Sequence, residues 1–411
     1  MMNEREYIRD LASKLFDYGS MQEQQEKIKL IKACNDLKPV RPIVFARPEN
    51  GWSDLHEKWG SHKCEDRRLR VIEDSLLKGI IRAEHIPDDM PVLPEYRVPL
   101  RILNNGYNDF GVQLEVTETE REKGAYHIEP AIRNWEDIKK LHFRKLGVDR
   151  EGSREDMEFA HALLGDILDV YTVGVTDWRY GLTRVLIHMR GFQQFLMDMY
   201  DYPEETHNII QFLADNFANE MDYYTKENLI SPNTLDNDYI GVGGPCATDD
   251  LPGREHQSDF GVKDCAVWAE SQETIGVSPA QFEEYVFKYQ KPLVDQFGLC
   301  GYGCCEGLEG RFDILKKGLD NLRWIAVSPW ADAEKMAEQI GRDYVYLYKV
   351  NPALVVSPQA DWEAAEKQVR NIKRLTDGMS VQFSLKDTNT FCNEPERIIR
   401  WVDMAMKIAA E

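Results

Sequence analysis

The sequence has no long apolar run. No stretch approaches the roughly 18 consecutive apolar residues of a membrane-spanning helix, so we expect no membrane partner. Residues 1–6 lack the apolar region of a signal peptide, and we therefore expect a cytoplasmic protein. Internal repeats and low-complexity segments are also absent, which leaves the alternation of short apolar runs with helical patterns as the main guide to the fold.

Basic residues are few. Lys and Arg number 50 against 71 Asp and Glu, which gives a formal net charge of −21. A chain with this charge repels phosphate backbones and anionic lipids, so we expect no nucleic-acid partner. The acidic surface is interpreted chiefly as a means of staying soluble.

The eight cysteines are not interpreted as disulfides. In a chain of 411 residues without a secretion signal, reduced thiols are expected, some of them as metal ligands. Four of the eight fall in one stretch of the chain, namely Cys265, Cys300, Cys304 and Cys305.

Short apolar runs alternate with helical patterns after residue 95. Eight runs read as strands: 98–103, 170–175, 239–242, 266–269, 299–302, 324–327, 344–348 and 381–385. Helical patterns separate most of them, at 182–200, 203–228, 279–297, 332–341, 361–376 and 394–409. Ser278 before Pro279, with Gln281 at the third position, predicts a capping box at one of these helix starts. Alternation of this kind predicts a parallel sheet, and eight strands predict a closed (β/α)8 TIM barrel over residues 96–411.

Residues 1–95 read as an N-terminal helical extension. Helical stripes cover residues 4–34, and a further helix is predicted near 65–82. We expect these helices either to cover the barrel or to pair two chains as a homodimer.

In a TIM barrel the catalytic groups stand at the C-terminal ends of the strands. This rule selects the candidate residues. Acid–base roles are expected for charged residues that follow strands, namely Asp109, Lys349, Lys386 and Asp387. Contacts with a small-molecule substrate are expected from Asp177, Trp178, Gln272, Tyr302 and Trp330. The alternative for Lys386 and Asp387 is a simple ion pair with each other or with neighbouring loop residues.

The run Cys304-Cys305-Glu306 is the most unusual of these features. Thiolate sulfur and carboxylate oxygen are both good zinc ligands, and an open fourth position makes the ion a Lewis acid. The candidate metal ligands are therefore Glu270, Cys304, Cys305 and Glu306. The alternative is a pair of buried thiols in a tight turn, with Glu306 paired to Arg311 or Lys386.

Two histidine-containing segments are given no catalytic role. Asp54, His56 and Gly60 stand in an order similar to a corrinoid-binding motif, but the glycine comes one residue too late and no dinucleotide fold surrounds it. His188 lies on an apolar helix and is interpreted as a packed core residue.

The chain resembles the uroporphyrinogen decarboxylase superfamily, and more narrowly its corrinoid-dependent methyltransferase branch. The resemblance rests on five segments: Tyr302-Gly-Cys-Cys-Glu-Gly-Leu, Asp313-Ile-Leu-Lys, Ile325-Ala-Val-Ser-Pro-Trp-Ala-Asp, Lys349-Val-Asn-Pro and Ser384-Leu-Lys-Asp. It implies a (β/α)8 barrel. In the methyltransferases it implies zinc and a partner protein that carries cobalamin. Cys304 keeps a zinc-ligand position, Tyr302 stands where those enzymes have His, and Cys392 is a further candidate ligand.

The resemblance leaves three hypotheses. The first is a zinc-dependent methyltransferase that removes an O-methyl group from a small molecule and needs a corrinoid protein. The second is a metal-free decarboxylase, for which Asp109 matches the family's aspartate but the N-terminal arginine motif is missing. The third is a barrel that binds a small molecule without catalysis.

Overall fold

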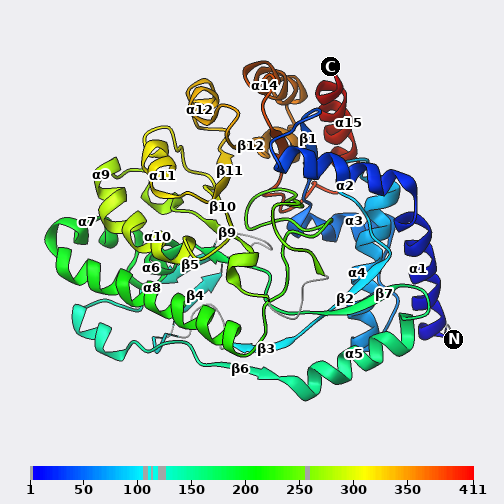
Figure 1. Ribbon diagram of the computed structural model, residues 1–411, viewed down its shortest axis with the longest axis horizontal. Coiled ribbons are helices and arrows are strands. Elements are labelled where there is room, and N and C mark those ends of the chain that lie inside the picture. Colours follow the sequence, from blue (N-terminus) through cyan, green and yellow to red (C-terminus); the bar gives the residue numbers. More distant parts are fainter. Residues whose placement is uncertain (1–2, 105–109, 113, 119–125, 255–259) are drawn as a thin grey trace.

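The computed structural model describes residues 3–104, 110–112, 114–118, 126–254 and 260–411. Its centre is a seven-stranded parallel sheet with the strand order β1-β13-β12-β11-β10-β9-β8, and Figure 1 shows helices arranged around it. The strands are β1 (Ile43–Ala46), β8 (Arg179–Tyr180), β9 (Ala266–Ala269), β10 (Leu299–Tyr302), β11 (Leu322–Val327), β12 (Val345–Lys349) and β13 (Val381–Leu385). All six neighbouring pairs in this sheet are parallel.

Five of the eight predicted strands belong to this sheet, as β9 to β13. The prediction for 98–103 was wrong in its extent, because the run divides at Leu100 into β2 (Glu95–Pro99) and β3 (Arg101–Asn104). β2 pairs in parallel with β7 (Asp169–Val173) outside the main sheet. The strand predicted at 239–242 was also wrong, since only a single bridge between Tyr239 and Pro245 forms there.

The main sheet ends at β1 on one side and at β8 on the other. Among the described residues no ladder joins these two ends, so the observed architecture is an α/β fold around a parallel sheet, without the hydrogen-bonded closure of an eight-stranded barrel. β1 comes from the segment expected to be only a helical extension, and it pairs with β13 from Ile43↔Gln382 to Ala46↔Leu385. The sheet therefore crosses the domain boundary expected at residue 95.

The α-helices include all of the predicted ones. Their bounds are α1 (Glu4–Gly19), α2 (Gln22–Asn35), α3 (Trp52–Trp59), α4 (Arg67–His85), α5 (Arg150–Leu164), α6 (Leu182–Arg190), α7 (Phe192–Asp201), α8 (Pro203–Lys226), α9 (Pro279–Phe282), α10 (Lys288–Val294), α11 (Phe312–Gly318), α12 (Ala333–Ile340), α13 (Ala353–Val356), α14 (Trp362–Leu375) and α15 (Glu396–Ala410). The capping box predicted at Ser278 is confirmed, with its side chain accepting from the Gln281 N–H. No helix in the described part of the chain is both long and apolar enough to cross a membrane.

Four small strands form two antiparallel pairs in the segment between β2 and α5. β6 (Leu146–Asp149) pairs antiparallel with β3, and β4 (Glu115–Glu118) pairs antiparallel with β5 (Tyr126–Glu129). Figure 1 shows this cyan segment alongside α8. It provides one wall of a cavity described below.

Two buried tryptophans, Trp268 on β9 and Trp324 on β11, belong to the same hydrophobic cluster. The Trp268 ring packs so closely on β10 that a Cβ on Gly301 would lie 2.1 Å from it. Trp324 is buried as well, and its Nε1 donates to Asn35 Oδ1 at 2.9 Å. Because Gln382 also donates to Asn35 Oδ1, at 2.8 Å, the end of α2 is tied to two strands of the sheet. These contacts fix α2 against the starts of β11 and β13, at the end of the sheet opposite the candidate site.

Candidate functional site

Charged and thiol side chains follow four strands of the main sheet at the same edge. Glu270 follows β9, Cys304 follows β10, Lys349 ends β12 and Lys386 follows β13. All four side chains are buried, although Glu270, Lys349 and Lys386 carry charges that are costly to bury without partners. Since the carboxyl ends of parallel strands form the usual binding edge of such a sheet, this edge is the candidate site.

Glu306 holds two loops of the site together. Its carboxylate accepts hydrogen bonds from the backbone N–H of Ser271 at 2.9 Å and from that of Cys304 at 2.8 Å. The side chain is almost fully buried, at 1% exposure. Both oxygens are therefore used for backbone contacts, which explains the buried glutamate as a positioning group for Glu270 and Cys304.

The two adjacent thiols lie beside a buried ammonium group. Cys304 Sγ and Cys305 Sγ are 3.7 Å apart, and Lys349 Nζ donates to Cys304 Sγ at 3.2 Å. The hydrogen bond with Cys304 lowers the pKa of Cys305 to about 7, with burial opposing and the Lys349 charge assisting this change. The same hydrogen bond, together with burial, raises the pKa of Cys304. Cys305 is also the more exposed of the two thiols, so we expect it to react first.

Glu270 is a buried carboxyl group with an unused oxygen. Its Oε2 has no hydrogen-bond partner among the described residues. Burial raises the pKa of Glu270 to about 8, and the neighbouring Cys304 and Glu306 add to the rise. A buried acceptor without a partner is unusual in a folded protein and is typical of a ligand or proton-transfer site.

Lys386 forms the ion pair that was the alternative interpretation. Its Nζ donates to Asp387 Oδ1 at 2.9 Å and lies 4.0 Å from Glu49 Oε1. Asp387 has a φ of +59°, a left-handed conformation that is rare for a non-glycine residue. The strained turn places the Lys386 ammonium at the strand end, with Asp387 exposed to solvent over nearly half of its side chain.

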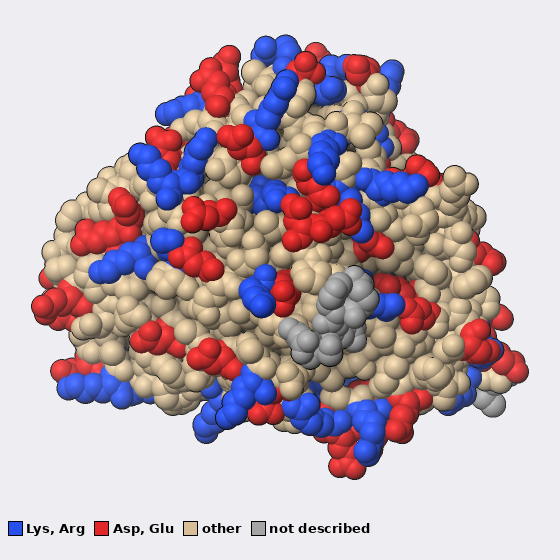
Figure 2. Space-filling view, in the orientation of Figure 1, with Lys and Arg blue, Asp and Glu red and all other residues tan. Residues whose placement is uncertain are grey.

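Glu270 reaches a cavity of about 730 Å³ between the sheet and the segment that carries β3 to β5. Trp178 and Asp177 line the same cavity. Asp177 accepts from Arg179 Nε at 2.8 Å, and this pair also borders a second cavity of about 590 Å³. Figure 2 shows basic and acidic side chains interspersed over one face of the molecule, without a single broad basic area.

The other predicted residues have different surroundings. Tyr302 is fully buried, and its hydroxyl donates to Gln290 Oε1 at 2.7 Å, so it packs against α10. Trp330 is 67% exposed. Gln272 begins a short 3-10 helix after Glu270 and is half-buried. Asp109 lies outside the described residues.

Sequence reasoning missed two residues on the cavity wall. Arg184 and His188 both line the larger cavity, so the interpretation of His188 as a packed core residue was wrong. The helical spacing could have shown this. Arg184 and His188 are four residues apart and share one face of α6, whereas Val185, Leu186 and Met189 occupy its buried face. Burial lowers the pKa of His188, and Arg184 lowers it further.

Thiolate sulfur and carboxylate oxygen are donor types that zinc accepts. Zn–S bonds of about 2.3 Å in a tetrahedral site place two sulfurs about 3.8 Å apart, close to the 3.7 Å between Cys304 and Cys305. Glu270 adds a buried carboxylate oxygen without a hydrogen-bond partner among the described residues. In the described part of the chain, the only group of three possible metal ligands with donor atoms within 4.8 Å of one another is His56, His62 and Asp74. Glu270, Cys304 and Cys305 thus do not bring three donor atoms within 4.8 Å of one another in this structure.

Comparisons with known proteins find similarity among solved structures only. No family model matches the sequence, and no curated protein matches it. A solved structure described as a methyltransferase from Methanosarcina mazei is similar over 92% of this chain and 98% of its own, with 11% sequence identity and a TM-score of 0.47.

Proposed function

We propose that this protein is a methyltransferase that removes an O-methyl group from a small methoxylated molecule and transfers it to a corrinoid protein. The observation that carries the proposal is the thiol pair Cys304 and Cys305, 3.7 Å apart, beside the unpartnered Glu270 oxygen at the strand ends. This donor set suits zinc, and the family resemblance of the surrounding segments supports the same assignment.

Glu270, Cys304 and Cys305 would hold the metal. Zinc, when bound, supplies a Lewis acid for the ether oxygen of the substrate. Lys349 contributes a buried positive charge that favours the thiolate form of the pair. Glu306 contributes through the backbone, since it fixes the N–H groups of Ser271 and Cys304.

The substrate would occupy the cavity beside Glu270. Trp178 lines this cavity, where the edge of its largely buried ring would contribute an apolar contact to a small aromatic molecule. In the reaction the bond between the methyl carbon and the oxygen would break as the methyl group passes to the corrinoid partner, which would supply the electron pair of the new bond. The oxygen would keep the pair of the broken bond and take up a proton. The Lys386 ammonium, buried at the end of β13, is the proposed proton donor.

The decarboxylase alternative requires free cations for a polycarboxylate. The second cavity contains several arginines, but each of the following has an acidic partner: Arg82 with Asp88, Arg97 with Asp238 and Arg179 with Asp177. Their charges are thus largely balanced within the protein. This favours the methyltransferase over a metal-free enzyme that acts on a tetrapyrrole acid.

Metal analysis and a methyl-transfer assay test the proposal together. The full chain would be assayed with a panel of methoxybenzoates and chemically reduced cobalamin, with formation of methylcobalamin as the readout. We expect Cys304→Ser to lose zinc and transfer, while the matched variant Cys392→Ser, whose thiol donates to Val356 O, keeps both. Full transfer by a metal-free protein would contradict the zinc assignment. A non-catalytic binder would show no transfer that depends on Glu270, Cys304 or Glu306.

A further inference from the structure

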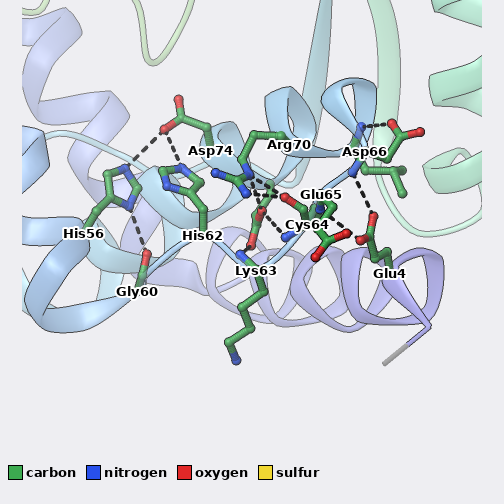
Figure 3. Close-up of polar contacts among 12 residues, drawn as sticks. Glu4, His56, Gly60, His62, Lys63, Cys64, Glu65, Asp66, Arg70 and Asp74 are labelled. Carbon is green, nitrogen blue, oxygen red and sulfur yellow. Dashed lines mark hydrogen bonds and ion pairs between the residues drawn. The ribbon is translucent and has the colours of Figure 1, made fainter. Parts of the chain in front are cut away.

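Two histidines and an aspartate converge in the N-terminal segment, away from the candidate site. His56 lies on α3, His62 lies on the loop that follows, and Asp74 lies on α4. One ligand atom from each lies within 4.8 Å of the other two. Figure 3 shows both imidazole rings directed toward the same Asp74 carboxylate.

The tautomer of His56 follows from its hydrogen bond. Its Nδ1 lies 3.1 Å from the carbonyl oxygen of Gly60, which only accepts, so Nδ1 carries a hydrogen. In the neutral ring Nε2 then presents a lone pair. This nitrogen is buried without a hydrogen-bond partner among the described residues, and it lies 3.3 Å from Asp74 Oδ1, which is also an acceptor. Two acceptors that face each other in a protein interior need either a proton or a metal cation between them.

The distances suit a metal ion with nitrogen and oxygen ligands. Asp74 Oδ1 is 3.3 Å from His56 Nε2 and 3.1 Å from His62 Nε2. Tetrahedral zinc with bonds of about 2.0–2.1 Å separates its ligand atoms by about 3.3–3.4 Å. Histidine ligands usually donate their other ring nitrogen to a backbone carbonyl, as His56 does to Gly60.

The surrounding contacts hold the three ligands in place. Lys78 Nζ donates to Asp74 Oδ2 at 2.6 Å, which leaves Oδ1 directed toward the two rings. The loop that carries His62 is fixed by the fully buried Glu73, which accepts from the backbone N–H of Lys63 and that of Cys64. His62 and Asp74 remain partly exposed, at 25% and 36% of their side chains, so an ion can enter from solvent.

We propose that His56, His62 and Asp74 form a binding site for one divalent transition-metal ion, with zinc as the reference ion and water in the fourth position. The ion would fasten α3 and its following loop to α4. Trp52, at the start of α3, and Lys78 both line the smaller cavity of about 590 Å³, so the metal would also fix one wall of that cavity.

The test uses the full chain in a Cys304→Ser, Cys305→Ser background, which separates this site from the thiol site of the proposed function. After removal of bound metal, equilibrium dialysis against zinc should give one ion per chain. Cobalt should give the visible bands of a four-coordinate site without a thiolate charge-transfer band. His62→Gln should weaken zinc binding at least about tenfold.

His85→Gln is the matched control, because His85 lies on α4 and stacks on Trp59 outside the cluster. It should bind zinc as the background chain does. Zinc should also raise the melting temperature of the background chain and of His85→Gln, with no rise in His62→Gln. Absence of zinc binding in the background chain, or equal binding by His62→Gln and His85→Gln, would overturn the proposal.

Discussion

The ammonium group of Lys349 lies 3.2 Å from Cys304 Sγ inside the protein, at the end of β12. Lys349 is 2% exposed, so solvent screens its charge only weakly. The positive charge and the hydrogen bond between the two thiols together favour ionisation of Cys305. The ends of β10 and β12 therefore bring two thiols and a buried positive charge together at the candidate site.

Alkylation rates test this relationship. At pH 7.5 iodoacetamide should modify Cys305 readily, since its pKa is about 7 and it is one of two cysteines that are only partly buried. Both Lys349→Met and Cys304→Ala should slow the modification of Cys305 several-fold, because each removes a cause of the low pKa. Peptide mass spectrometry would follow Cys305, with Cys392 in the same chain as the internal control. Unchanged Cys305 rates in both variants would refute the interpretation.

Glu270 should make the free energy of unfolding of the metal-free protein depend on pH. Burial raises its pKa from 4.5 to about 8, so the folded state holds this proton more tightly than the unfolded state. The resulting stabilisation is full below pH 4.5 and is lost as the pH rises through 8. Urea unfolding of the chelator-treated protein should show that the free energy of unfolding declines between pH 5 and 9. Glu270→Gln should reduce this decline by up to a few kcal/mol. Parallel curves for the two proteins would exclude Glu270 as the cause.

Replacement of Glu306 should destabilise the site loops. Glu306→Ala leaves the buried N–H groups of Ser271 and Cys304 without acceptors, which costs about 2–5 kcal/mol of unfolding free energy. Glu306→Gln keeps one acceptor and should cost less. Urea denaturation measures both. Glu334→Ala, at an exposed position of α12, is the control and should change the unfolding free energy by less than about 0.5 kcal/mol.

Gly301 should tolerate no side chain. A Cβ there would lie 2.1 Å from the Trp268 ring, so Gly301→Ala must displace the tryptophan or the strand. We expect a loss of at least about 1–3 kcal/mol and a lower melting temperature. Gly310→Ala adds the same methyl group where nothing lies within 4 Å, and it should leave the melting temperature nearly unchanged. Equal behaviour of the two variants would show that the close packing on Trp268 is unimportant.

The sequence pattern predicted β9 to β13 well, because these strands are short apolar runs buried on both faces and followed by strong helix starts. It failed at 239–242, where Gly241 adopts a φ of +51° and the backbone turns over the Trp268 ring. It also failed at Leu100, which follows Pro99, a residue without a backbone N–H for a sheet. Periodicity reports which residues are apolar and gives no information on such tertiary contacts.

The location of the candidate site followed from strand ends, whereas the roles of its residues did not. Glu270, Cys304, Lys349 and Lys386 stand where the strand rule placed them. The commitment of Glu306 to two backbone groups depends on the neighbouring loop and is invisible in the sequence. The cluster of His56, His62 and Asp74 was missed because its members come from three elements with no motif spacing.

The pairing of β1 with β13 has a consequence for biosynthesis. Asn35 at the end of α2 bonds Gln382 across 347 positions of the chain, and Ile43 pairs with the same strand. During translation β1 therefore cannot pair until β13 has been synthesised, when nearly all of the chain has left the ribosome. During that interval the apolar strand Ile43–Ala46 lacks its partner strand, and the backbone groups that later pair with β13 remain unpaired.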